Sequence, residues 1–250
     1  HVECVCNANN PSSALLEKIS FVDKVIKIKT GKNRWLGRIR FFISLSKTII
    51  GRDKFVIRFH NSRLLKVITF FFRKKCIGHA NFYNSEISAS RYYSNSITSD
   101  FNNHEIMINL DLSKLFKLSG KFEKNSFRIE AIEQAKILED ADILIHVGSS
   151  QKQNWKRPSV ELVKPLLERY SGSRIIFIGT SDEYKDTESF IRQIKEGASI
   201  VNLCGKLTLI ELGALMRKSN MVIGGDSFPI HFAAALGVKT IGIYGPTDWK

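Results

Sequence analysis

The chain has 250 residues, of which 43% are hydrophobic and 25% are charged. This composition is typical of a folded globular protein and excludes an intrinsically disordered chain, and the length is enough for two domains. The densest apolar run, Val67–Phe72, is too short to cross a bilayer, so we expect no transmembrane helix. The chain begins at His1 without a recognisable leader and stops in a loop at Lys250, so we expect residues to be missing from both ends.

The formal net charge of +14 and a pI near 9.7 favour anionic partners. Nucleic acid, phospholipid headgroups and phosphorylated glycans all fit this charge, and a basic surface that is only solvated is the alternative. The sequence carries neither an aromatic-plus-basic RNA motif nor a helix-turn-helix pattern, so we expect no nucleic acid partner.

The cysteines Cys4, Cys6, Cys76 and Cys204 lack the spacing of a zinc site and are too few for a disulfide framework in a chain of this length. We therefore expect reduced thiols, no metal site and a cytoplasmic protein.

Strand-like and helix-like patterns alternate through the first half of the chain. Alternating apolar and charged residues predict strands, and apolar residues at helical spacing predict helices. In chain order, the predicted elements are a strand at 1–8, a helix at 13–19, a strand at 22–29, a helix at 35–49, a strand at 54–60, a helix at 64–72, a short strand ending at Gly78, a loop at 81–103 and a helix within 101–120. Such an alternation predicts a parallel sheet covered by helices.

A charged stretch at 120–140 predicts a linker, and we place the two domains at 1–135 and 136–250. The alternation continues after the linker without a break. In chain order, the second domain has predicted strands at 141–147, 173–179, 199–202, 221–224 and 239–245, and predicted helices at 159–170, 180–197, 208–220 and 229–236. Thr208 and Glu211 have the spacing of a capping box, which predicts a structural role for both.

The last thirty residues, MVIGGDSFPIHFAAALGVKTIGIYGPTDWK, predict a strand, a glycine turn, a short helix and a second strand. Ligands of open α/β sheets bind at the carboxyl ends of strands, and a helix start favours phosphate. Asp226, Ser227 and His231 lie within about one turn of this helix start. This grouping predicts a site for an anion such as a pyrophosphate, with a carboxylate left for hydroxyl groups. The alternative is that Asp226 and Ser227 only cap the helix and His231 only packs.

The segment DSFPIHFAAALGVKTIGIYGPTD resembles the signature of the heptosyltransferases of glycosyltransferase family 9, which build the bacterial lipopolysaccharide core. That signature is Asp-Ser/Thr-Gly, two residues, His, an Ala-rich helix and a Gly-Pro-Thr-Asp turn. Phe228 departs from it, because the family usually has glycine there. The segment 54–80 is similar to the family more weakly.

The resemblance implies an α/β fold of the GT-B type, in which two Rossmann-like domains with parallel sheets face a cleft. The amino-terminal domain would lack its first strand and loop. The implied reaction is an inverting, metal-independent transfer of a heptose from a nucleotide-sugar donor such as ADP-heptose to a lipopolysaccharide core or lipid A acceptor. No cofactor is expected. The implied location is the cytoplasm, with peripheral contact at the inner face of the cytoplasmic membrane.

The resemblance also assigns donor contacts in the second domain. Ser227 and the helix start near His231 would hold the pyrophosphate, Asp226 the sugar hydroxyls, and Phe228 would lie beside the phosphates. Further donor contacts are expected at Ser149 and Ser150 for phosphate, Glu183 for ribose and Leu207 for adenine. The family has a phosphate-binding lysine at the position of Gln153, so we expect the flanking Lys152 or Lys156 to replace it.

Acceptor contacts are expected at the predicted strand end formed by His60, Asn61, Ser62 and Arg63. The general base of the family is an Asp in the first loop of the first domain, which would precede His1, so we name no catalytic base. We therefore expect this chain to bind donor but to transfer sugar poorly. Another GT-B enzyme, such as a different nucleotide-sugar transferase or an epimerase, is the alternative. A degenerate nucleotide-sugar binder is a further alternative because of Phe228.

Overall fold

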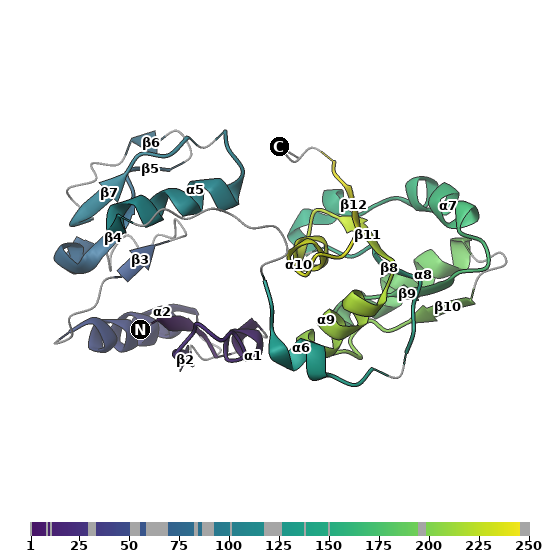
Figure 1. Ribbon diagram of the computed structural model, residues 1–250, viewed down its shortest axis with the longest axis horizontal. Coiled ribbons are helices and arrows are strands. Elements are labelled where there is room, and N and C mark those ends of the chain that lie inside the picture. Colours follow the sequence, from purple (N-terminus) through teal and green to yellow (C-terminus); the bar gives the residue numbers. More distant parts are fainter. Residues whose placement is uncertain are drawn as a thin grey trace. The chain divides into compact units, whose positions relative to one another are not determined.

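The computed structural model shows an α/β protein in which most strands are parallel (Figure 1). It describes residues 2–8, 10, 12–29, 34–50, 56–58, 70–82, 85–86, 93–100, 102–117, 127–137, 139–149, 151–194 and 199–245. The chain divides into two compact units. The first contains His1–Ser13 and Val22–Glu123, and the second contains Ala14–Phe21 and Lys124–Trp249. The division into functional domains at residue 135 stays a prediction.

The first unit begins with a parallel pair of strands, β1 (Glu3–Asn7) and β2 (Lys24–Ile28). The long helix α2 (Arg34–Ile49) packs against this pair. Its side chains Leu45 and Ile49 are buried with Ile28, Val5, Ile26 and Phe42. The patterns at 1–8, 22–29 and 35–49 therefore predict these elements correctly.

A second parallel sheet of the first unit has the order β3 (Val56–Arg58), β4 (Cys76–His79) and β7 (Asn95–Ile97). The prediction of a loop over 81–103 is wrong at β7 and at a two-stranded antiparallel pair, β5 (Asn81–Phe82) and β6 (Ser85–Glu86). These strands are too short and too polar to show an alternating pattern, and pairing with the buried strand β4 is what stabilises β7.

The helix predicted within 101–120 is shorter in the structure. Helix α5 (Glu105–Asp111) continues into the 3-10 turn Leu112–Phe116 and ends at Lys117, whose left-handed backbone (φ 55°) cannot extend a helix. The ring of His104 accepts a hydrogen bond from the Ile106 N–H (3.2 Å) and so caps α5. The predicted helix at 64–72 lies mostly outside the described residues.

The second unit is built on a five-stranded parallel sheet (Figure 1). Its strands are β8 (Ile143–His146), β9 (Arg174–Phe177), β10 (Ser199–Asn202), β11 (Met221–Gly225) and β12 (Thr240–Ile243). They lie in the order β10-β9-β8-β11-β12. The chain thus builds outward from β8 to β10 and then returns to the other side of β8 to form β11 and β12.

Helices cover both faces of this sheet. Helices α7 (Val160–Arg169) and α8 (Tyr184–Ile194) pack against one face. Helices α6 (Glu130–Gln134), α9 (Leu209–Lys218) and α10 (Phe228–Ala235) pack against the other, together with Leu15 of α1 (Ser12–Leu16). Neighbouring strand residues point to opposite faces, so Ile143 and Ile145 meet the first set of helices and Leu144 meets the second.

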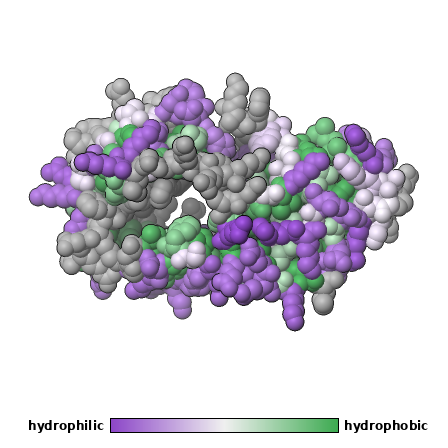
Figure 2. Space-filling view, in the orientation of Figure 1, coloured by the Kyte–Doolittle hydropathy of each residue, from purple (hydrophilic) through white to green (hydrophobic). Residues whose placement is uncertain are grey.

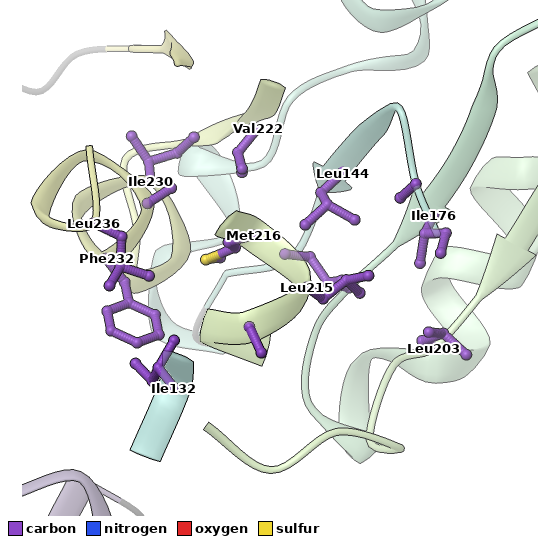
Figure 3. Close-up of a cluster of buried hydrophobic side chains, with 14 of the residues drawn as sticks. Ile132, Leu144, Ile176, Leu203, Leu215, Met216, Val222, Ile230, Phe232 and Leu236 are labelled. Carbon is purple, nitrogen blue, oxygen red and sulfur yellow. The ribbon is translucent and has the colours of Figure 1, made fainter. Parts of the chain in front are cut away.

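Figure 3 shows how the second face is filled. Leu215 of α9 lies below the strand side chain Leu144, Met216 lies on the side of α9 toward α10, and Phe232 of α10 reaches Ile132 of α6. The surface of this unit visible in the right half of Figure 2 has many hydrophilic residues with hydrophobic ones between them. The interior of the second unit is a core of apolar side chains between the sheet and the helices on each face, and this core holds the strand ends in place.

The predicted helix boundaries of the second unit are confirmed at several ends. Pro229 lies in the first turn of α10, and Gly237 follows its last turn with φ 77°. Thr208 and Glu211 form the predicted capping box at the start of α9. No helix in the described part of the chain has the length and apolar character needed to cross a membrane.

The core of the second unit predicts a contrast between two leucines. Leu144 is fully buried in the central strand, whereas Leu162 on α7 is 57% exposed. We expect Leu144→Ala to lower the free energy of unfolding by about 2–5 kcal/mol because it leaves a cavity, and Leu162→Ala to change it by less than about 0.5 kcal/mol. Urea denaturation followed by circular dichroism measures both values. Equal effects of the two substitutions would contradict this packing.

Candidate functional site

The strand order of the second unit reverses between β8 and β11. Helix α7 follows β8 onto one face of the sheet, and α10 follows β11 onto the other. Neither helix therefore lies over the carboxyl ends of these two strands, which is where open α/β sheets bind ligands. The residues at these ends are His146, Gly148 and Ser149 after β8, and Asp226 and Ser227 after β11.

Glycines allow polar groups to approach one another closely at this edge. A Cβ atom on Gly148 would lie 1.9 Å from Oε1 of Glu183, and one on Gly225 would lie 2.4 Å from the carbonyl oxygen of Lys156. Both contacts are shorter than any real side chain tolerates. Gly148 therefore admits the Glu183 carboxylate, and Gly225 admits the turn that carries Lys156.

The buried ring of His146 connects two of the predicted donor residues. His146 is 4% exposed, and its Nδ1 lies 2.9 Å from Oγ of Ser227. Its Nε2 lies 3.6 Å from Oε1 of Glu183, which is ion-pair distance. The other carboxylate oxygen, Oε2, accepts hydrogen bonds from the Thr180 N–H (2.7 Å) and the Thr180 hydroxyl (2.9 Å). A continuous polar chain thus runs from the start of α8 to the start of α10.

Glu183 is ionised in this setting. Burial raises the pKa of the carboxyl, but the His146 ring and the N–H and hydroxyl of Thr180 stabilise the carboxylate more strongly, and the net pKa falls from 4.5 to about 2. The negative charge of Glu183 is therefore present at every pH at which the protein is expected to function.

A second polar group surrounds Asp226. The ammonium of Lys156 donates to Oδ2 at 2.6 Å, and Nε2 of His231 lies 3.1 Å from Oδ1. The hydrogen bond from Lys156 lowers the pKa of Asp226, with burial acting against it and His231 adding to the decrease. The side chains of Lys156 and Asp226 are only 15% and 19% exposed, so this ion pair is partly desolvated.

The start of α10 is not capped by a side chain. Ser227 occupies the cap position, but its hydroxyl turns to His146 and makes no capping bond. The structure does not fit the alternative that Asp226 and Ser227 only cap the helix and that His231 only packs, because Asp226 binds Lys156 and His231 is 59% exposed. Phe228 is 46% exposed and stacks on Phe232 at a centroid distance of 5.1 Å. Pro229 in the first turn has no N–H and the Ile230 N–H donates to the Ser227 carbonyl oxygen (3.2 Å), so the helix start offers an anion the Phe228 N–H and the partial positive charge of the helix dipole.

The remaining predicted donor residues lie around this edge or outside the described residues. The Ser149 hydroxyl donates to the Gln153 carbonyl oxygen (3.0 Å) and so stabilises the turn after β8. Leu207 is partly buried against the core. Ser150 and the side chain of Lys152 lie outside the described residues, as do all four predicted acceptor residues, His60, Asn61, Ser62 and Arg63.

A small pocket of about 80 Å³ lies beside Glu183. It is bordered by Val147 and Gly148 after β8, by Pro158, and by Arg157, which pairs with Asp186 of α8 at 2.7 Å. Ligand sites for drug-sized molecules usually measure about 300–1,000 Å³. This pocket alone is therefore too small to enclose a nucleoside.

Sequence reasoning missed the contacts of His146 and left Lys152 and Lys156 as alternatives for the site. His146 is a polar residue at the end of the apolar run ILIH and directly precedes a Gly-Ser turn, which was a usable signal. The choice between the two lysines depends on the path of the 3-10 turn Gln151–Lys156, which the sequence does not specify. The structure places the ammonium of Lys156 beside Asp226.

The lowered pKa of Glu183 predicts a pH dependence of stability. Because the folded-state pKa is depressed, the stabilisation is complete above about pH 4.5 and is lost as the pH falls toward 2. A shift of this size corresponds to about 3 kcal/mol. We expect Glu183→Gln to remove this part of the acid destabilisation, as measured by urea denaturation between pH 2 and pH 7. If the free energies of unfolding of the unaltered protein and of Glu183→Gln change with pH in the same way, the Glu183 carboxylate is not stabilised by these contacts.

Comparison with known proteins gives matches over most of the chain. The family model of glycosyltransferase family 9 (heptosyltransferase) matches residues 56–250. Lipopolysaccharide heptosyltransferase 3 of Escherichia coli is 39% identical over 72 residues, which are 28% of this chain and 21% of that protein. Lipopolysaccharide heptosyltransferase 1 of Campylobacter coli is 30% identical over 109 residues, which are 42% of this chain and 32% of that protein. The matches thus span about a third or less of these curated relatives.

The fold also matches a solved structure. The E. coli heptosyltransferase WaaC with ADP superposes with a TM-score of 0.73 at 17% identity, covering 98% of this chain and 78% of that one. A likeness at this identity is evidence for the fold alone, and it confirms the predicted α/β fold of the GT-B type.

Proposed function

Because the chain belongs to glycosyltransferase family 9, the heptosyltransferase family, we propose that it transfers a heptose from a nucleotide-sugar donor such as ADP-heptose to a lipopolysaccharide core or lipid A acceptor. The observation that carries this proposal is the polar edge at β8 and β11. The Lys156 ammonium, the start of α10 and the Asp226 carboxylate meet there, where the strand order of the sheet reverses.

In this proposal the donor diphosphate binds at the start of α10. Ser227 and the free end of α10 contact the phosphates, and Lys156 supplies the charge that the family places at the position of Gln153. The ammonium of Lys156 lies 2.6 Å from Asp226, which directly precedes the helix. Ser149, Ser150 and Phe228 are proposed to lie beside the phosphates, Glu183 near the ribose and Leu207 near the adenine.

The same groups suit the chemical step. As the sugar leaves, negative charge develops on the diphosphate, and positive groups placed there in advance stabilise it. We propose that Lys156 and the α10 start have this role in an inverting transfer that needs no metal. Asp226 accepts hydrogen bonds from the sugar hydroxyls and so fixes the anomeric carbon relative to the leaving group.

Two substitutions separate the phosphate role from the sugar role. Lys156→Ala removes a cation near the phosphates, so we expect the affinity for both ADP and ADP-heptose to fall about tenfold or more. Asp226→Ala removes the sugar contact but leaves Lys156 unpaired. We therefore expect ADP-heptose to lose about tenfold to a hundredfold in affinity relative to ADP, whose affinity is retained or increased. Isothermal titration calorimetry measures all four constants.

The matched control is Lys185→Ala, which removes the same charge from an exposed position on α8 and should leave both affinities unchanged. Equal losses for ADP and ADP-heptose in Asp226→Ala would exclude a sugar contact by this residue. Tight binding of UDP-sugars instead of ADP-heptose would favour a different nucleotide-sugar enzyme of the same fold. Failure to bind any of these nucleotide sugars would contradict the proposed function.

We also propose that the first unit contacts an anionic membrane surface at the cytoplasmic face, where a lipid-anchored acceptor would be held. Helix α2 exposes Ile39 (38%) and Ile43 (47%), and Phe71 is 67% exposed beside Phe42 (ring centroids 6.2 Å apart). Exposed basic side chains accompany these residues at Arg40, Lys47, Arg73 and Lys74. Apolar side chains flanked by basic ones are typical of surfaces that bind anionic lipid.

This surface predicts binding to lipid vesicles. We expect the protein to sediment with phosphatidylglycerol vesicles and not with phosphatidylcholine vesicles, because the basic residues need anionic headgroups. The double substitution Ile39→Glu and Ile43→Glu should weaken this binding about tenfold or more. Leu162→Glu, at an exposed apolar position on α7, is the control and should bind as the unaltered protein does. Unaltered binding by the double variant would exclude α2 as the membrane contact.

A further inference from the structure

We propose that His146 is a positioning residue that takes up a proton when the donor diphosphate binds, and so turns the Ser227 hydroxyl from an acceptor into a donor toward the phosphate. This inference rests on the proposed function, because it assumes a diphosphate at the start of α10. In this inference His146 does not touch the substrate but sets the direction of the Ser227 hydroxyl.

The two ring nitrogens of His146 face partners of different character. Nε2 faces the Glu183 carboxylate at 3.6 Å, and Nδ1 faces the Ser227 hydroxyl at 2.9 Å. A carboxylate can only accept hydrogen bonds, whereas a hydroxyl can donate or accept. Because Glu183 is ionised, the favoured neutral ring carries its proton on Nε2 and leaves Nδ1 as an acceptor.

This tautomer fixes the direction of the Ser227 hydroxyl in the ligand-free protein. The Ser227 O–H donates inward to Nδ1, so the lone pairs of its oxygen face outward. A phosphate oxygen is also an acceptor and cannot hydrogen-bond to these lone pairs. Ser227 in this state therefore does not bind a diphosphate at the helix start.

Protonation of the ring reverses the hydrogen bond. An imidazolium donates at both nitrogens, so Nδ1–H donates to the Ser227 oxygen and the hydroxyl proton becomes free to donate to a phosphate oxygen. The added proton comes from solvent and no covalent bond between heavy atoms changes. The positive ring then lies between the Glu183 carboxylate and the diphosphate, so both anions favour it. Binding and protonation are therefore linked, and each promotes the other.

Other charged groups near this site could also take up a proton. Glu183 approaches the ring from the β9–α8 connection, and Asp226, Lys156 and His231 form the neighbouring cluster at the β11–α10 connection. Of these, His231 is the competing candidate, because it is 59% exposed and contacts the Asp226 carboxylate. An experiment must therefore distinguish His146 from His231.

Calorimetry of ADP-heptose binding in buffers of different ionisation enthalpy counts the protons taken up. ADP-heptose is the probe because its diphosphate is esterified at both ends and does not titrate near neutral pH, unlike the terminal phosphate of ADP. We expect a net uptake of protons when ADP-heptose binds, and an affinity for ADP-heptose that falls as the pH rises.

The matched variants are His146→Asn and His231→Asn. An asparagine amide can occupy the place of Nδ1 and donate to Ser227 without titrating. We therefore expect His146→Asn to bind ADP-heptose without proton uptake and without the alkaline loss of affinity. His231→Asn should retain the proton uptake. Circular dichroism establishes that both variants are folded.

The outcomes separate this inference from the proposed function. If ADP-heptose binds without proton uptake, or if His146→Asn retains the uptake, the role of His146 is wrong and the proposed function stands. If only His231→Asn abolishes the proton uptake, the proton binds at the exposed His231–Asp226 pair, and the inference about His146 is overturned. If the unaltered protein binds ADP-heptose at no pH, the proposed function fails, and the inference fails with it.

Discussion

The parallel pairing of β8 with β11 is the constraint on which the candidate site depends. Met221 lies opposite Ile143, and Gly224 lies opposite His146. The two strands are far apart in the sequence, and the helices that follow them leave to opposite faces of the sheet. A shift of one residue in this register would turn His146 to the other face and separate it from Ser227. The buried apolar core on both faces of the sheet opposes such a shift.

The candidate site contains two carboxylates, and each is held by its own positive or hydrogen-bonding partners. Glu183 is stabilised by His146 and Thr180, and Asp226 by Lys156 and His231. Both partner sets come from different segments of the chain, so the charges are in place before any ligand arrives. A site whose dipoles and charges are held by such contacts needs little reorganisation during a reaction.

The chain departs from the family signature at two positions, and the structure gives a physical account of each. Gln153 replaces the usual lysine, and the ammonium of Lys156 reaches the site from the same turn because Gly225 lets the turn backbone approach β11. Phe228 replaces a glycine, and its ring stacks along the helix on Phe232. Ser227 retains its contact with His146 despite the added bulk.

The sequence by itself determined the alternation of strands and helices in the second unit, the start and end of α10, and the family, because these depend on local patterns of apolar residues, glycine and proline. It also placed Asp226 and Ser227 at a helix start. It did not determine the short polar strand β7, which exists only because β4 is beside it. Nor did it determine the role of His146 or the choice of Lys156, since both depend on contacts between residues about 70–80 positions apart. Only tertiary structure decides such contacts, because the register of parallel strands and the path of a turn are set by the packing of the whole unit.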